Sequence, residues 1–292
     1  MLHKTTLSNG VRIVTEKIPY VKSASLGIWV KTGSRNEKEN EHGISHFIEH
    51  MQFKGTKSRN AFEISEAFEK MGAQVNAYTT KEYTCFLLKV LGEYFFDAAD
   101  ILCDMFFNSI YSSVDIENEK KVVIEEIKSY EDMPEEIVHE YFAKAFFDGH
   151  PLGKPILGTI ESVSSFTKNK IFDFLKREYI GSNIIISVSG NINHREIVDS
   201  LGYAFEINIP QGDNSKYIPP EIKPQTIIKY KNCEQVQICL GTPALSHTDE
   251  DIYALTILNN VVGGSLSSRL FQEIREKRSL AYSIYSYNVS FF

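Results

Sequence analysis

The sequence has 292 residues, of which 42% are hydrophobic and 24% are charged, and its formal net charge is −7. This composition is typical of a globular protein with room for one complete domain and part of another. The acidic balance argues against a nucleic-acid partner, because phosphate-binding surfaces are usually basic. No apolar run approaches the roughly 18 residues of a membrane-spanning helix, and the start lacks a secretion signal. We therefore expect no membrane partner and take the cytoplasm as the default location.

Strand and helix patterns follow one another along the chain. Strands are predicted at residues 11–14, 25–30, 72–80, 83–90 and 183–188, and helices at 44–51, 61–71, 93–107, 114–130 and 134–147. The helix at 134–147 has proline in its first turn, where its missing N–H costs nothing. Strands and helices in this mixed order predict an α+β domain, with a mixed sheet flanked by helices.

A proline-rich stretch and a repeat follow the first domain. Residues 209–224 hold four of the nine prolines and predict a linker. Beyond it the opening pattern recurs, with a strand predicted at 236–241 and a helix at 252–262. The segment GSLSSR also parallels the earlier GTKSR at an offset of about 210 residues. We therefore predict two homologous repeats, a catalytic domain at 1–212 and a truncated second domain at 213–292.

The segment HFIEH, residues 46–50, is the sharpest local signal. On a helix, His46 and His50 share one face and can hold one metal ion. Glu49 would then reach a water molecule on that metal without binding the metal itself. The inverted order H-x-x-E-H occurs among zinc peptidases. The alternative is two histidines on a solvated helix face.

The helix predicted at 114–130 offers a third ligand. Glu119 and Glu126 lie seven residues apart, which is two helical turns, so they share one face. Val122 and Val123 are close to that face and suggest that it packs inward, whereas a solvated acidic surface is the alternative. None of the four cysteines forms a C-x-x-C pair, which argues against a sulfur-ligated zinc site.

Residues 46–56 (HFIEHMQFKGT) resemble the signature of the pitrilysin-type (M16) metallopeptidases, which include insulin-degrading enzyme and the processing peptidases. In that family the third zinc ligand is a glutamate about 76 residues after the second histidine, which corresponds to Glu126. The resemblance implies one Zn²⁺ per chain, held by His46, His50 and Glu126. It also implies that Glu119 orients a ligand or tunes the metal.

Other matches extend the resemblance to the whole chain. The segment NAYT resembles the family's edge strand, so Asn76 and Ala77 are expected to pair with substrate backbone; an ordinary internal strand is the alternative. The segment REKRSLAY resembles an element of the second repeat in which Arg275 would hold a substrate carbonyl and Tyr282 would stabilise an oxyanion. The alternatives are a surface charge and a core aromatic residue. Gln52 departs from the family, which usually has an apolar residue at that position.

These residues predict a zinc-dependent endopeptidase that hydrolyses peptides or unfolded segments, with Glu49 as the base. The main alternative is a non-catalytic subunit of the same fold, and the second is a zinc-binding module without hydrolysis. Expected partners are a peptide substrate and either a second copy or a second M16-like subunit. At the repeat offset the two histidines correspond to Thr256 and Asn260, so the second repeat is not expected to bind zinc. Because that repeat stops early, we expect this chain to be a fragment and a poor peptidase by itself.

Overall fold

A computed structural model describes residues 2–213 and 217–291. The chain divides into a first unit that ends at Cys239 and a second unit that begins at Leu240. The first unit holds all the named strands, and its helical and strand structure ends at Asn208. The border predicted between residues 212 and 213 lies in the coil that follows and stays a prediction.

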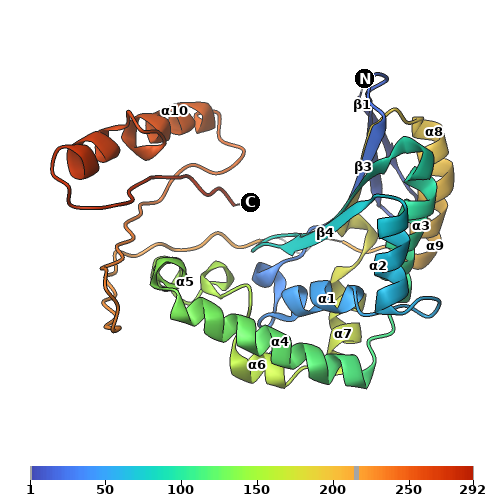
Figure 1. Cartoon of the computed structure of the whole chain (residues 1–292), viewed down its shortest axis with the longest axis horizontal. Coiled ribbons are helices and arrows are strands. Elements are labelled where there is room, and N and C mark those ends of the chain that lie inside the picture. The colour runs from blue at the N-terminus through green and yellow to red at the C-terminus, as the bar shows by residue number, and fades with distance from the viewer. Residues whose placement is uncertain (1, 214–216, 292) are drawn as a thin grey trace. The chain divides into compact units, whose positions relative to one another are not determined.

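One six-stranded sheet organises the first unit, in the order β1-β2-β6-β3-β5-β4 (Figure 1). Strands β2 and β6 are parallel and the other neighbours are antiparallel, so the sheet is mixed, as predicted. The strands are β1 Leu2–Thr6, β2 Arg12–Lys17, β3 Ser23–Val30, β4 Gln74–Thr79, β5 Thr84–Leu91 and β6 Ile184–Gly190. The first of them, β1, was not predicted.

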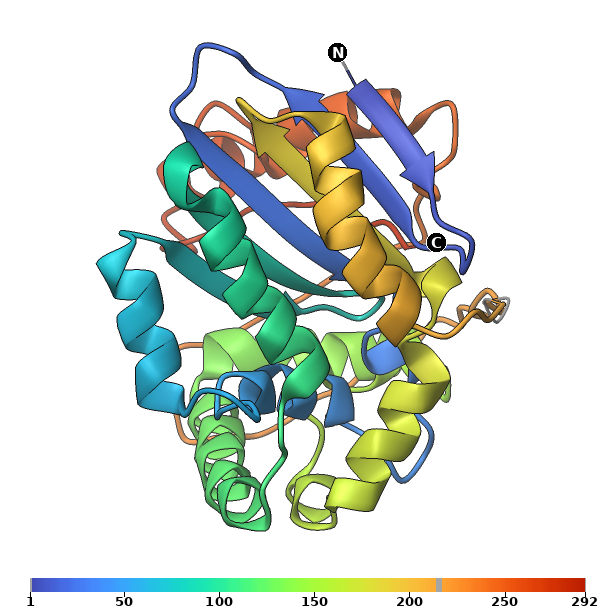
Figure 2. The same ribbon diagram turned by 90° about the vertical axis from the view of Figure 1, so that its right-hand side faces the viewer.

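Side-chain alternation gives the inner strands of the sheet a buried face. In β6 every second residue is buried, and β3 repeats the pattern with Leu26, Ile28 and Val30. Successive side chains of a strand point to opposite faces, so this spacing sets one face against the core. Helix α3 packs on β5 and helix α8 on β2, and Figure 2 shows α3 and the α8–α9 segment crossing that face.

The remaining elements are helices. In the first unit they are α1 Ile44–Gln52, α2 Ala61–Lys70, α3 Phe95–Asn108, α4 Ser113–Asp132, α5 Pro134–Phe146, α6 Ile160–Ser164, α7 Lys168–Glu178, α8 His194–Ile197 and α9 Tyr203–Asn208. Short 3₁₀ segments lie at Ser34–Asn36, Gly92–Tyr94, Pro151–Gly153 and Gly181–Asn183, and π-helical turns at Val198–Gly202 and Phe271–Glu276. The predicted helices are therefore confirmed, apart from small shifts at their ends.

Strand β4 lies at the end of the sheet and pairs only with β5 among the named strands. Asn76 and Ala77 therefore belong to an edge strand, and the alternative of an internal strand is excluded. The Ala77 N–H donates to the Asn76 side chain at 2.9 Å instead of to a neighbouring strand. An edge strand with outward backbone groups is a template for adding another strand.

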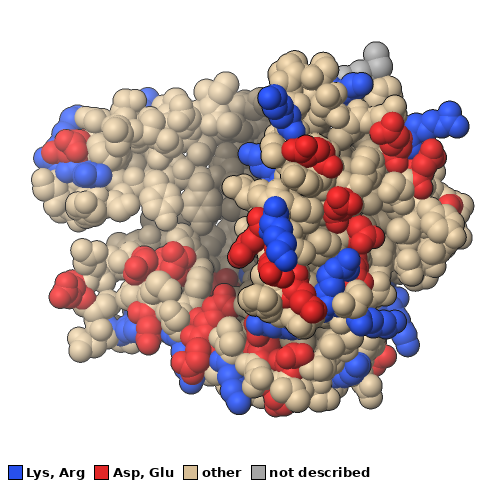
Figure 3. Space-filling view, turned by 45° about the vertical axis from the view of Figure 1, so that its right-hand side comes forward, with Lys and Arg blue, Asp and Glu red and all other residues tan. Residues whose placement is uncertain are grey.

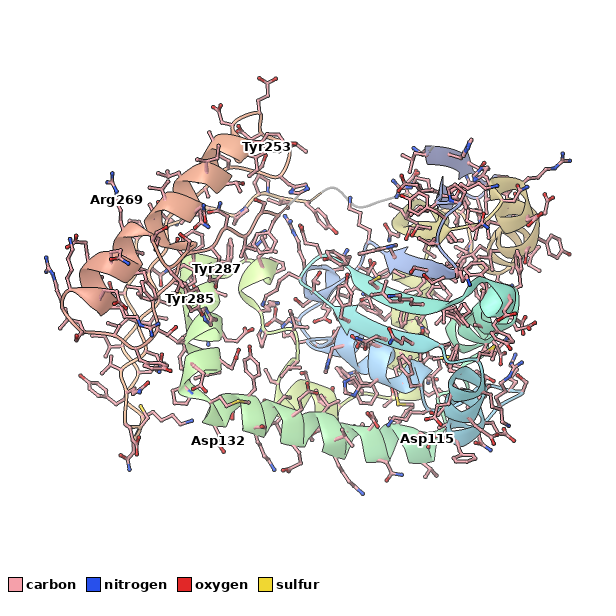
Figure 4. The ribbon with its side chains drawn as sticks, turned by 45° about the horizontal axis from the view of Figure 1, so that its top comes forward. Asp115, Asp132, Tyr253, Arg269, Tyr285 and Tyr287 are labelled. Atoms are coloured by element: carbon pink, nitrogen blue, oxygen red, sulfur yellow. The ribbon has the colours of Figure 1, made fainter. Side chains whose placement is uncertain are left out.

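The second unit contains helix α10 Ile252–Gly263, which confirms the helix predicted at 252–262. The strand predicted at 236–241 is wrong, because the structure has irregular backbone there. A β-strand needs a hydrogen-bonding neighbour, and in the described chain no strand follows β6. Figure 4 labels Tyr285 and Tyr287 of this unit, whose rings stack with centroids 6.0 Å apart.

Within the described residues, no helix combines the length and the apolar character that crossing a membrane requires.

Candidate metal centre

Helix α1 carries both histidines of the H-x-x-E-H segment. Its apolar stripe is buried in the core and consists of Ile44, Phe47, Ile48 and Met51. The helix begins after Gly43, whose φ is 87° and whose added Cβ would lie 2.5 Å from the Leu157 carbonyl oxygen. Only glycine fits this position. The stripe fixes the rotation of the helix, so His46 and His50 share the side that faces α4.

The carboxylate of Glu37 caps the start of α1. It accepts hydrogen bonds from the backbone N–H groups of Gly43 at 2.8 Å and Ser45 at 2.9 Å. Gly43 has no side chain that could do this, so a residue upstream of the helix satisfies two of its free donors. Burial raises the pKa of Glu37 to about 8, although both hydrogen bonds lower it. Glu37 thereby anchors the helix that carries the site.

Helix α4 supplies the carboxylates. It starts with Ser112, whose hydroxyl accepts from the Asp115 backbone N–H, and it runs between the labelled Asp115 and Asp132 in Figure 4. It packs against α1. Glu119 and Val123 are buried, so the face predicted to turn inward does so, whereas Val122 is half exposed.

The two helices bring three donor groups to one point. The ligand atoms of His46, His50 and Glu126 all lie within 4.8 Å of one another. Glu126 Oε2 is 3.8 Å from the Nε2 atom of each histidine. These contacts are too long to be hydrogen bonds, so the three groups converge without bonding to each other.

This convergence fits a zinc ion. Glu126 Oε2 is buried and has no hydrogen-bond partner among the described residues, a costly state for a carboxylate oxygen unless something else satisfies it. Zinc binds histidine nitrogen and carboxylate oxygen at about 2.0–2.2 Å, so two of its tetrahedral ligands lie about 3.4 Å apart. Three protein ligands also leave the fourth position for water or substrate. The donor set suits a hydrolytic site better than a closed structural one.

Glu119 orients one of these histidines. The Nδ1–H of His50 donates to Glu119 Oε1 at 2.8 Å, which leaves Nε2 to face Glu126. Lys54 Nζ holds the other oxygen of Glu119 at 2.6 Å. A carboxylate behind a histidine sets its tautomer and makes the free nitrogen a better metal ligand. Burial would raise the pKa of Glu119, but the hydrogen bonds from His50 and Lys54 outweigh it and keep the pKa low.

The two imidazoles differ in their electrostatics. Burial, and after it the neighbouring His50, lowers the pKa of His46 to about 3. The His46 ring is therefore neutral at pH 7 and keeps a lone pair for a metal. The hydrogen bond to Glu119 raises the pKa of His50 in spite of burial. In the described structure Nδ1 of His46 is buried and without a hydrogen-bond partner, so Glu119 supports only one of the pair.

Glu49 lies beside the cluster and outside it. It is 9% exposed, and Thr79 Oγ1 donates to its Oε2 at 2.5 Å. Burial raises the pKa of Glu49, and the Thr79 hydrogen bond opposes this. A pocket of about 320 Å³ opens here and is lined by Glu49, His50, Phe53, Lys54, Val75, Asn76, Ala77 and Glu119. The predicted base, one predicted ligand and the predicted substrate-binding residues thus share one cavity.

Acidic and basic side chains are mixed on the face of the molecule shown in Figure 3. Near the cluster several of them are paired, as in the contact between Lys54 and Glu119. The charges that define the site are therefore the carboxylates of Glu119 and Glu126, which face the histidines, and not an extended surface of one charge.

Arg275 and Tyr282 belong to the second unit. The Arg275 guanidinium lies 5.2 Å from the centre of the Tyr282 ring and 4.7 Å from that of Phe271. Tyr282 is 83% exposed in this chain, and the alternative of a core aromatic residue in a complete second domain stays open. The structure brings these two residues together, and their role toward substrate stays a prediction.

Three contributors to the site were not predicted: Lys54, Thr79 and Glu37. Lys54 follows His50 by four residues, and Thr79 ends the segment NAYT, so both belong to the segments that carry the family resemblance. Glu37 is one of three glutamates in the charged stretch at 33–43, and carboxylates before a helix that starts at glycine were the available signal. The contacts of Lys54 and Thr79 depend on how α4 and β4 pack beside α1, which the sequence does not show.

The order of His46, Glu49 and His50 is that of the inverted H-x-x-E-H motif of zinc peptidases. The chain belongs to peptidase family M16, the insulinase family, whose sequence model matches residues 12–160. Residues 165–292 match the peptidase M16 inactive domain. The second of two M16 domains is therefore only partly present in this chain.

Two similar proteins are an uncharacterized zinc protease of Bacillus subtilis, YmxG, and an uncharacterized zinc protease of Streptomyces coelicolor, SCO5738. The first is 46% identical over 291 residues, which cover 100% of this chain and 71% of the relative. The second is 39% identical over 298 residues, covering 99% and 65%. The chain thus spans about two thirds of the length of these relatives. A crystal structure of a peptidase M16 inactive domain from Pseudomonas fluorescens shares the fold, with a TM-score of 0.86 at 17% identity over 99% of this chain and 71% of that one.

Proposed function

We propose that this chain forms the zinc-binding part of an endopeptidase that hydrolyses peptides or unfolded segments. One observation carries the proposal. His46, His50 and Glu126 converge within 4.8 Å around a buried carboxylate oxygen that has no hydrogen-bond partner among the described residues. The Glu49 carboxylate, which is not part of that cluster, lies in the adjoining pocket. A structural zinc site has no use for this additional carboxylate, so Glu49 favours hydrolysis over metal storage.

His46, His50 and Glu126 would hold the ion, which would polarise the scissile carbonyl and acidify a water molecule. Glu49 takes the proton from the attacking water. The raised pKa of Glu49 suits this task, because a base works best when its pKa approaches the working pH. The same carboxyl group then donates the proton to the leaving amine. Glu119 keeps the His50 ring in the required tautomer throughout.

We propose that the substrate binds along the edge strand β4. A peptide that adds to β4 beside Asn76 and Ala77 would lie along the pocket that contains Glu49 and His50. We further propose that Arg275 holds a substrate carbonyl and that Tyr282 donates to the developing oxyanion. Residues 165–292 match the peptidase M16 inactive domain. This match supports an accessory role, without a zinc ion of its own, for the segment that contains Arg275 and Tyr282.

The test is cleavage of a quenched peptide by the full-length protein and by its Glu49→Gln variant. The amide keeps the shape of the side chain but cannot accept the proton. We expect kcat to fall by at least about 100-fold, on the scale of general acid–base catalysis, while one zinc per chain remains bound. Near-normal turnover with full zinc would contradict the proposal and would favour a different base. An inactive parent that binds zinc would favour the non-catalytic subunit.

A further inference from the structure

The Glu49 carboxylate is held by a residue of the edge strand. Thr79 Oγ1 donates to Glu49 Oε2 at 2.5 Å, across thirty positions of sequence. Thr79 is the last residue of β4, and Glu49 lies on α1, which packs against that strand. One hydroxyl group therefore connects the strand with the side chain proposed as the base.

A second hydroxyl group, that of Thr84, lies near the hydroxyl of Thr79 but donates elsewhere. Thr84 lies directly opposite Thr79 in the β4–β5 ladder, and the two Oγ1 atoms are 3.4 Å apart. Thr84 donates its only hydroxyl proton to the Thr32 carbonyl oxygen at 2.9 Å, and both of these residues are 1% exposed. A threonine hydroxyl has one proton to donate. Thr84 therefore cannot take the place of Thr79 as a donor to Glu49.

The backbone N–H and C=O groups of Thr79 point to the same side of β4 as the groups proposed to pair with substrate. The N–H of Ala77 turns away from β5, since it donates to the Asn76 side chain. Backbone groups alternate along an antiparallel strand, so the outward residues are Val75, Ala77 and Thr79. A peptide strand that pairs with Val75 and Ala77 would order β4 up to the residue that holds Glu49.

We propose that Thr79 is a positioning residue that holds Oε2 of Glu49, leaves Oε1 for proton transfer, and couples the seating of peptide backbone on β4 to the orientation of the base. This inference rests on the proposed function, because it needs Glu49 to be the base. The hydroxyl acts in two ways. It restricts the rotation of the Glu49 carboxylate, which must be oriented toward a water molecule. It also donates a hydrogen bond to one of the two carboxylate oxygens in a largely buried site.

The variants Thr79→Val and Thr79→Ser separate the hydroxyl from the shape of the side chain. Valine keeps the β-branched shape and removes the donor, whereas serine keeps the donor. For Thr79→Val we expect kcat to fall roughly 10- to 100-fold, the loss that corresponds to a hydrogen bond to a charged group. KM should stay within about threefold, and zinc should remain at one per chain. Thr79→Ser should restore kcat to within about threefold of the parent.

A double variant distinguishes this role from a general disturbance of the strand. If Thr79 acts through Glu49, Thr79→Val should cause no further loss in a Glu49→Gln background. An unchanged kcat in Thr79→Val, equal losses in the valine and serine variants, or full additivity in the double variant would each overturn the proposal. If Glu49→Gln turns over normally, the proposed function and this inference both fail. If Glu49→Gln is inactive and Thr79→Val is normal, only this inference fails.

Discussion

Two helices that both carry apolar residues at helical spacing have opposite environments in this molecule. In α1, Phe47, Ile48 and Met51 are at most 1% exposed, because the helix packs against the sheet and against α4. In α10 of the second unit, Tyr253, Ile257 and Leu258 are more than half exposed. Apolar spacing thus identifies a helix in both units, but burial depends on the elements available to cover it. The metal-binding residues of α1 lie on the helix whose apolar side is buried.

The comparison extends to strands. The run at 25–30 became part of β3, which has β5 on one side and β6 on the other. The similar run at 236–241 stays irregular. A strand needs a partner for its backbone groups, and the described part of the chain offers none there. We therefore expect the two units to respond differently to substitution.

Core truncation should give the largest contrast in stability. Phe47 is fully buried, so Phe47→Ala should lower the free energy of unfolding by about 3–5 kcal/mol. Leu258 is 57% exposed, so Leu258→Ala in this chain should change it by less than about 0.5 kcal/mol. Urea denaturation followed by circular dichroism measures both. Similar losses for the two variants would show that α10 is packed as tightly as α1.

Loss of an oxyanion donor should affect turnover and not metal binding. We expect Tyr282→Phe in the full-length protein to lower kcat about 100-fold, because phenylalanine keeps the ring and removes the donor. Zinc content should not change, since all three proposed ligands lie in the first unit. The exposed Tyr253→Phe variant is the matched control and should keep its activity. If kcat is unchanged in Tyr282→Phe, the second unit does not supply this group.

The buried carboxylate of Glu37 should make stability depend on pH. Its pKa rises from 4.5 to about 8 on folding, because burial disfavours the charged form. Between pH 4.5 and 8 the unfolded chain has lost the proton that the folded chain keeps. The contribution of Glu37 to the free energy of unfolding is therefore full below about pH 4.5 and decreases as the pH rises toward 8. Relative to Glu37→Gln, the parent should lose up to about 1.4 kcal/mol per pH unit in this window.

The matched control for this effect is Glu39→Gln on the same loop. Glu39 is exposed, and the hydrogen bond from Lys154 lowers its pKa, so its contribution is lost only as pH falls below about 4.5. Unfolding curves at several pH values measure all three proteins. If the stability of the parent and that of Glu37→Gln change in parallel between pH 5 and 8, Glu37 is ionised in the fold.

The sequence predicted the site better than its surroundings. Helical spacing alone placed His46 and His50 on one face, and the family resemblance selected Glu126 among four glutamates of one helix. By contrast, Thr79 acts through a contact with a residue thirty positions away, and Glu37 reaches the start of α1 across a loop, and no periodicity reveals either contact. Gln52 was noted as a departure without a role. It is buried, and its Nε2 has no hydrogen-bond partner among the described residues, which a polar residue in an apolar family position explains.

The missed strand β1 and the wrong strand at 236–241 share one cause. β1 is mostly exposed and has no apolar alternation to read, yet it pairs along its full length with β2. The later run has the alternation, but the described residues provide no strand beside it. Strand formation is decided by partners elsewhere in the chain, so single-segment patterns err in both directions.

Zinc content tests the central claim most directly. Inductively coupled plasma mass spectrometry of the purified chain should find about one zinc per chain, and His50→Ala and Glu126→Gln should each lose it. Glu125→Gln is the matched control, since Glu125 is an exposed neighbour on the same helix that pairs with Lys128 and should keep the metal. A full equivalent of zinc in His50→Ala or Glu126→Gln would contradict the assignment of these residues as ligands.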